Sequence, residues 1–142
     1  MNINTLMKKM LELNELLTSI MEESGYNETY DLLAIEWDET NPNDCMLYSE
    51  LFGVLQHLDY VHQVLDYLGK PISHEGILCY GGNGKYELDG IELKEGERVE
   101  VLEEDEFTNH IKWQEIYIPY ENNLKELPES LSVVGKRVRI RR

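Results

Sequence analysis

The stretch "GILCYGGNGKYELDGIEL", residues 76–93, decides how the second half of the chain folds. Its apolar and polar residues alternate with a period of two, which is typical of β-strands. The dipeptides Asn83-Gly84 and Asp89-Gly90 interrupt this alternation. An Asn-Gly pair favours the type I′ turn, because both central residues of that turn need a positive φ. The stretch therefore predicts antiparallel strands joined by hairpin turns, with a type I′ turn at Asn83-Gly84.

The same glycines and Lys85 also suggest a phosphate-binding loop. A Walker A loop needs a glycine five places before the glycine of its Gly-Lys pair, and Ser or Thr after the lysine. Cys79 and Tyr86 occupy those two places. The residues that follow alternate like a strand, so no helix N-terminus is expected to hold phosphate. We interpret the stretch as two turns around one strand and not as a nucleotide site.

The period of two continues to the C-terminus, with further turn signals at Glu95-Gly96 and Gly135-Lys136. The alternating segments after Leu93 are "RVEVLEE", "HIKWQEIYIPY", "SVV" and "RVRIR". Five or six short strands in so few residues predict a small antiparallel, SH3-like β-barrel. We place this β domain at residues 75–142.

The first seventy residues have a helical period instead. Two apolar series with spacings of three and four form one stripe each: Ile3, Leu6, Met10, Leu13, Leu17 and Ile20, then Leu51, Val54, Leu58, Val61, Leu65 and Leu68. Two stripes of similar length predict two long helices that pack along coiled-coil-like seams. The packing is either a hairpin within the chain or a homodimer, and the hairpin is the simpler interpretation.

The ends of these helices have recognisable signals. Asn4 or Thr5 is expected to cap the first helix, and Gly25 to end it. Ser49 is expected to cap the second, and Gly69 with Pro71 to end it.

Between the helices, Asn27 is expected to cap a short third helix that contains Tyr30, Leu33 and Trp37, followed by a loop, "DETNPND". The predicted fold class is therefore α+β, with a helical domain at residues 1–71.

Composition limits the possible partners. The 142 residues include 28 acidic and 13 basic side chains, a formal net charge of −15. Such a charge disfavours nucleic acids and anionic membranes and suits a protein partner with a basic surface.

Cys45 and Cys79 are too few for a disulfide framework. With no signal-peptide pattern or apolar run of bilayer length, we expect a soluble, cytoplasmic protein.

No catalytic motif is recognisable. Asp59, His62 and Asp66 share one face of the second helix, with the spacing of a possible divalent-metal site, but a solvated helix face is the simpler interpretation. No serine or cysteine lies in a nucleophile motif such as G-x-S-x-G. We therefore expect no metal, no cofactor and no enzymatic activity.

Charge is distributed unevenly along the β half. Seven carboxylates crowd one hairpin region: Glu95, Glu97, Glu100, Glu103, Glu104, Asp105 and Glu106. In the terminal "KRVRIRR", Arg137, Arg139 and Arg141 share one strand face. These arginines either pair across the sheet with the acidic strand "RVEVLEE" or form a small nucleic-acid patch. The negative field of the chain favours pairing.

The β half also resembles a family of small domains of unknown function that occur chiefly in low-GC Gram-positive bacteria, often on plasmids, phages and integrative elements. The resemblance lies in "GKYEL" at residues 84–88, "GIEL" at 90–93, "EV" at 100–101, Trp113, and "GKRVR" at 135–139. It implies a compact β-module and a mobile-element setting. It implies no catalytic residues and does not extend to the helices.

These observations lead to two hypotheses of function. The first is a non-catalytic protein-interaction or regulatory protein of a mobile element or of the bacterial cytoplasm. The alternative is an acidic nucleic-acid mimic that inhibits a host-defence enzyme, of the anti-restriction or anti-CRISPR type, by occupying its basic channel. The expected partner-binding face is the seven-carboxylate region, extended by Glu87, Asp89 and Glu92.

Overall fold

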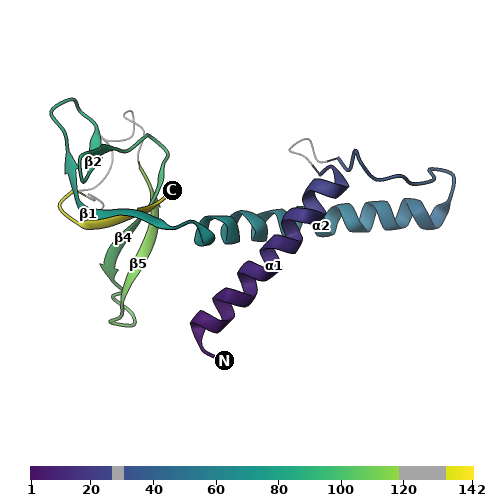
Figure 1. The fold of residues 1–142 in the computed structure, drawn as a ribbon, viewed down its shortest axis with the longest axis horizontal. Helices are drawn as coiled ribbons and strands as arrows, with labels where there is room; N and C mark the ends of the chain where they lie inside the picture. Colours follow the sequence, from purple (N-terminus) through teal and green to yellow (C-terminus); the bar gives the residue numbers. More distant parts are fainter. Residues whose placement is uncertain (27–30, 119–133) are drawn as a thin grey trace. The chain divides into compact units, whose positions relative to one another are not determined.

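The computed structural model describes residues 1–26, 31–118 and 134–142. It confirms the α+β class, with two long helices followed by an antiparallel sheet (Figure 1). The chain divides into a helical unit, Met1–Gly69, and a β unit, Lys70–Arg142, against predicted ranges of 1–71 and 75–142. In the described residues, no helix has a stretch that is both long and apolar enough to cross a membrane.

The first helix, α1 (Ile3–Ser24), begins earlier than its predicted cap. Asn2 is the N-cap, and its side-chain oxygen accepts a hydrogen bond from the Thr5 N–H at 2.8 Å. The predicted caps, Asn4 and Thr5, are therefore wrong. Gly25 ends the helix as expected, with a left-handed φ of +66°. Its N–H donates to the Glu22 carbonyl, which closes the last turn.

The second helix, α2 (Pro42–Gly69), starts seven residues before Ser49, so that predicted cap is also wrong. Pro42 occupies the first helical position, where its missing N–H costs nothing. The Asn41 side chain caps this end by accepting from the Asn43 N–H at 2.9 Å. The second half of the expected loop "DETNPND" is thus the first turn of a helix.

The predicted third helix is absent from the described part of the connection. Residues 31–41 contain turns and an isolated bridge between Tyr26 and Leu32, but no helical turn. Asn27 and Tyr30, its expected cap and first apolar residue, lie outside the described residues. Trp37 instead stacks on Tyr48 of α2, with 4.4 Å between ring centroids.

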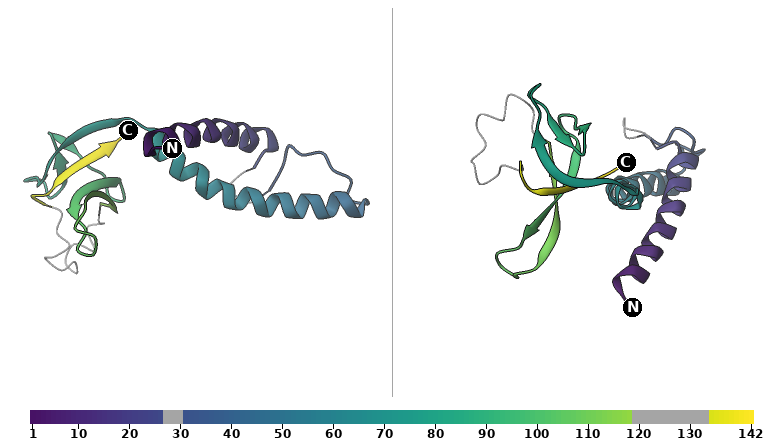
Figure 2. Two further views of the ribbon diagram at one scale, coloured as in Figure 1. Left: turned by 90° about the horizontal axis from the view of Figure 1, so that it is seen from below. Right: turned by 60° about the vertical axis from the view of Figure 1, so that its left-hand side comes forward.

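The two helices form a hairpin, but they cross obliquely and do not follow the predicted seams (Figures 1 and 2). Of the twelve stripe residues, only Leu17 and Leu65 are buried. Met21, Leu32 and Leu55 form the core of the helical unit. Buried Asn14 faces α2, where its side-chain oxygen lies 2.8 Å from Nδ1 of His62. The crossing leaves much of both stripes exposed.

The described residues of the β unit form one six-stranded antiparallel sheet in the order β3-β2-β1-β6-β4-β5. Its strands are β1 (Ile72–Tyr80), β2 (Tyr86–Leu88), β3 (Ile91–Glu92), β4 (Arg98–Glu104), β5 (Ile111–Tyr117) and β6 (Arg137–Arg141). The long β1 pairs with β6 through its first half and with β2 through its end. In the part of the chain described, β3 and β5 remain edges, so the predicted barrel is wrong: the sheet is open.

The predicted hairpins form, but their turns differ from expectation. Tyr80 pairs with Tyr86 across a five-residue loop, in which Gly84 has a positive φ and Asn83 does not. The Asn83 side chain instead accepts from the Lys85 N–H at 3.1 Å. The type I′ geometry occurs at Asp89-Gly90, where φ is 51° and 77°. The residues "SVV", 132–134, lie mostly outside the described part.

One face of the sheet forms an apolar core. Its fully buried side chains are Leu78, Leu88, Val99, Val101, Ile118, Val138 and Ile140. Successive residues of a strand point to opposite faces, so the alternating neighbours of these residues form the second face. That face contains Glu100 and the arginines of β6.

Candidate functional site

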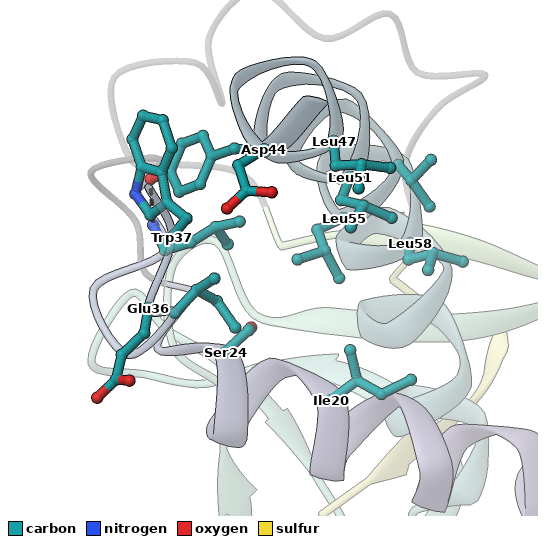
Figure 3. Close-up of a pocket in the computed structure, with 13 residues that line it drawn as sticks. Ile20, Ser24, Glu36, Trp37, Asp44, Leu47, Leu51, Leu55 and Leu58 are labelled. Carbon is teal, nitrogen blue, oxygen red and sulfur yellow. Dashed lines mark hydrogen bonds between the residues drawn. The ribbon is translucent and has the colours of Figure 1, made fainter. Parts of the chain in front are cut away.

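The helical unit contains an apolar groove of about 440 Å³ (Figure 3). It lies between α2, the C-terminal turn of α1 and the segment of residues 32–37. Its lining residues are Ile20, Ser24, Leu32, Ile35, Glu36, Trp37, Asp44, Leu47, Tyr48, Leu51, Val54, Leu55 and Leu58. A volume of this size is typical of protein binding sites.

The groove has a buried floor and a half-exposed lip. Leu32 and Leu55 at the floor are 4% and 7% exposed. Leu47, Leu51 and Val54 at the lip are 50%, 53% and 50% exposed. These side chains recur on α2 at helical spacing, and Leu58 continues their row for a total of about three turns, or roughly 16 Å. Because α1 crosses α2 obliquely, it leaves this row uncovered.

The opposite wall of the groove is held by a polar clasp. The Tyr48 hydroxyl donates to the Asp31 carboxylate at 2.7 Å, and the Leu32 N–H donates to the same carboxylate at 2.8 Å. These hydrogen bonds, first that of Tyr48 and then that of Leu32, lower the pKa of Asp31. The bond to Asp31 raises the pKa of Tyr48. The clasp fixes Tyr48, on which Trp37 stacks at the edge of the groove.

The groove lies in the part of the chain that holds most of the net negative charge. Residues 10–69 contain thirteen acidic side chains and no lysine or arginine. Glu36 and Asp44 contribute carboxylates to the lining, and in Figure 3 Asp44 lies between Trp37 and the leucine row. Our sequence interpretation placed the acidic surface in the β half. The signal that it missed is this sixty-residue gap without a basic residue.

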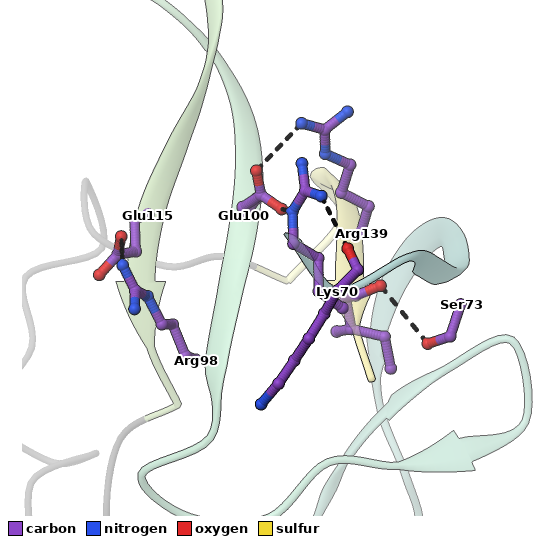
Figure 4. A network of polar contacts seen from close by, with 8 residues as sticks. Lys70, Ser73, Arg98, Glu100, Glu115 and Arg139 are labelled. Atoms are coloured by element: carbon purple, nitrogen blue, oxygen red, sulfur yellow. Dashed lines mark hydrogen bonds and ion pairs between the residues drawn. The ribbon is translucent and has the colours of Figure 1, made fainter. Parts of the chain in front are cut away.

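The predicted acidic region of the β unit is organised around a buried carboxylate. Glu100 accepts from Arg139 at 3.0 Å and from Arg141 at 2.9 Å (Figure 4). Glu100 and Arg139 are directly opposite on β4 and β6, which confirms pairing with the acidic strand for Arg139 and Arg141. Arg137 instead pairs with Glu75 of β1 at 3.1 Å, so the prediction is wrong for this arginine. Burial alone would raise the pKa of Glu100. The hydrogen bonds and charges of the two arginines outweigh burial and lower the pKa.

At least three of the other six carboxylates in the region have cationic partners in the described residues. Glu97 pairs with Arg142 at 2.7 Å, Glu103 with Lys136 at 2.5 Å and Asp105 with Lys112 at 2.6 Å. Glu95, Glu104 and Glu106 are exposed. Of the proposed extension, Glu92 pairs with Lys85, Glu87 is half-buried and Asp89 is exposed. The fold thus mixes these acidic side chains with basic ones, and their role as a partner-binding face stays a prediction.

The possible metal ligands on α2 have other surroundings. Nδ1 of His62 lies against Asn14 of α1, and Asp66 is exposed. Within residues 1–26, 31–118 and 134–142, no three His, Cys, Asp or Glu side chains are grouped to hold a metal ion. Cys45 and Cys79 are free thiols.

Asp105 provides a test of the hairpin's electrostatics. Its pKa is lowered from 3.8 to about 2, first by the hydrogen bond from Lys112 and then by the N–H groups of Phe107 and Thr108. This carboxylate therefore adds stability above pH 3.8, which is lost as the pH falls toward 2. We expect Lys112→Met to raise the Asp105 pKa part of the way to 3.8, measured by carboxyl ¹³C NMR titration. An Asp105 pKa of 3.8 in the unmodified chain would contradict the contact.

Comparisons of the chain with protein-family models, with curated proteins and with solved structures find no match. The resemblance of the β half to a small β-domain family stays a prediction. Function is therefore inferred from the groove and from the charge around it.

Proposed function

We propose that the chain is a non-catalytic protein-interaction protein and that the groove of the helical unit is its docking surface. The observation that carries the proposal is the half-exposed row of Leu47, Leu51 and Val54 above a buried floor. Fully burying one such side chain contributes about 1.5–3 kcal/mol, so completing the burial of the row is a substantial driving force for binding. Contiguous apolar patches of this kind mark interaction sites.

The polar side chains of the groove support binding over catalysis. A catalytic site needs several polar or titratable groups that converge on one reacting atom. Here the polar groups of the lining are those of Ser24, Glu36, Trp37, Asp44 and Tyr48, and the Tyr48 hydroxyl is already bonded to Asp31. The Asp44 carboxylate already accepts from the Asp38 N–H at 3.1 Å. In Figure 3 the Glu36 carboxylate points away from the leucine row.

The proposed setting on a bacterial mobile element rests on the resemblance of the β half. The alternative function, an acidic nucleic-acid mimic, rests on the same resemblance together with the net charge of −15. Two findings weigh against residues 95–106 as its binding face. In the described residues at least four of the seven carboxylates are in ion pairs. Residues 10–69, with thirteen acidic side chains and no lysine or arginine, hold −13 of the net charge of −15.

Site-specific photo-crosslinking in the native host tests the docking surface. A photoreactive residue at position 54, on the lip, is expected to give a discrete protein adduct that Leu51→Gln abolishes. The matched position is Leu16, an exposed α1 residue that does not line the groove. Identical adducts from positions 16 and 54, or an adduct at 54 that survives Leu51→Gln, would contradict the proposal.

A further inference from the structure

We infer that the occupant of the groove is a basic amphipathic helical segment of another protein, an inference that rests on the proposed docking function. Its apolar face would contact the leucine row of α2, and its Lys or Arg side chains would face the carboxylates at the rim. Three observations support this choice. The length of the groove fits a helix, carboxylates border the groove, and a second copy of the chain, the alternative occupant, is itself acidic.

The length of the groove fits a helix. The row from Leu47 to Leu58 runs along about three turns of α2, roughly 16 Å. A partner helix presents apolar side chains at spacings of three and four over the same distance, which is the usual pattern of recognition in a hydrophobic groove. The groove is open above Leu32 and Leu55, its buried floor, so the apolar side chains of a partner helix have space between its walls.

Carboxylates border the row on both sides. Asp44 comes three residues before Leu47, and Glu50 comes three residues after it, so on the helical wheel they flank the row in opposite directions. Glu36 lies on the facing segment. Residues 10–69 contain no lysine or arginine, so no permanent positive charge in this stretch of sequence offsets these carboxylates. A cationic segment is the complementary ligand.

A second copy of the chain is a poor occupant by the same criterion. Residues 1–69 contain thirteen acidic and two basic side chains, Lys8 and Lys9, a net charge of −11. A homodimer through the groove would bring two such surfaces together, and like-charge juxtaposition opposes association. An exposed charge pair adds little affinity by itself. The carboxylates of Glu36, Asp44 and Glu50 therefore set the association rate and the choice of partner, and the apolar row provides most of the affinity.

The test uses the full chain and three fluorescein-labelled, 18-residue designed peptides. The first has leucines on one helical face and lysines elsewhere; the second replaces the lysines with glutamate; the third has the composition of the first with the leucines scattered. Anisotropy titrations compare the unmodified chain with Leu51→Gln and with Leu16→Gln. The two leucines are 53% and 58% exposed, so neither change removes a core side chain.

We expect the first peptide to bind at least about tenfold more tightly than the other two. Leu51→Gln should weaken it about tenfold and Leu16→Gln less than twofold. The double variant Glu36→Gln, Asp44→Asn, or higher salt, should weaken it several-fold.

Each contrary result overturns the inference in a recognisable way. Equal binding of the lysine and glutamate peptides would show that charge does not select the occupant. Tight binding of the scattered peptide with no effect of Leu51→Gln would show a purely electrostatic contact. With no peptide bound, a dimer in ultracentrifugation that Leu51→Gln dissociates would identify a second copy as the occupant. Failure of all peptides without a dimer would also reject the basic segment, whereas the proposed docking function is decided separately by the adduct at position 54.

Discussion

Replacing Glu100 with alanine is expected to lower the free energy of unfolding of the β unit by about 3 kcal/mol, because it breaks a buried ionic cluster. The side chains of Glu100, Arg139 and Arg141 are only 9%, 17% and 15% exposed. Without the carboxylate, both guanidinium groups keep their partial burial and lose their main anionic partner. Arg139 would retain its position over the Trp113 ring, 4.2 Å from the centroid, and Arg141 its bond to the Lys70 carbonyl.

Urea unfolding followed by Trp113 fluorescence, in a Trp37→Phe background, measures this loss. The matched control is Glu103→Ala on the same strand, whose ion pair with Lys136 is more exposed and is worth about 0–1 kcal/mol. Glu100→Gln keeps the shape and the hydrogen-bond acceptor and is expected to fall between the two. Equal losses for Glu100→Ala and Glu103→Ala would show that the cluster is no stronger than a surface pair.

The same cluster sets part of the acid sensitivity of the β unit. The pKa of Glu100 lies below its ordinary value of 4.5, so the folded state binds its proton less readily than the unfolded state. The resulting stability is fully present above pH 4.5 and is lost as the pH falls through the folded-state pKa. Glu100→Gln should therefore flatten the stability curve below pH 4.5.

The β half shows how far local pattern can predict a fold. Alternation with a period of two predicted the strands and placed Arg139 and Arg141 on one face, and pairing with the acidic strand followed from charge. The strand order could not be predicted, because the adjacency of β6 to both β1 and β4 depends on contacts far apart in sequence. The type I′ turn was assigned to the wrong dipeptide because the Asn83 side chain stabilises a longer loop.

The groove was missed for a different physical reason. The apolar stripes predicted two helices that cover each other, whereas α1 faces α2 with Asn14 as well as with Leu17 and Met21. The crossing angle depends on this three-dimensional packing and not on spacing along either helix. Pro42 was interpreted as part of a loop although proline is favoured at the first position of a helix. The unpredicted first turn of α2 contributes Asp44, and the turns after it contribute the leucine row.

Replacing Gly25 with alanine is expected to lower the free energy of unfolding of the helical unit by about 3 kcal/mol. Gly25 has a φ of +66°, and an added Cβ would lie 2.7 Å from the Ala34 nitrogen and 3.0 Å from the Ala34 Cβ. The contact with the Ala34 nitrogen is a backbone contact, so the backbone at Ala34 would have to move to accept the new methyl group. Because the Ala34 N–H donates to the Ser24 carbonyl at 3.2 Å, that shift would also move the wall of the groove that contains Trp37.

Two glycines separate the effects of strain and contact in this experiment. Gly90 also has a positive φ, +77°, but its added Cβ meets nothing within 4 Å, so Gly90→Ala should cost only about 1–2 kcal/mol in the β unit. Gly53 lies inside α2 with equally open space, so Gly53→Ala should raise the stability of the helical unit by up to about 1 kcal/mol.

Urea unfolding followed at 222 nm reports the helical unit, and Trp113 fluorescence reports the β unit. If Gly25→Ala lowers the free energy of unfolding no more than Gly90→Ala does, the backbone around Ala34 moves aside at little energetic cost. In that case the groove would have a movable wall, and its shape would be set by the ligand.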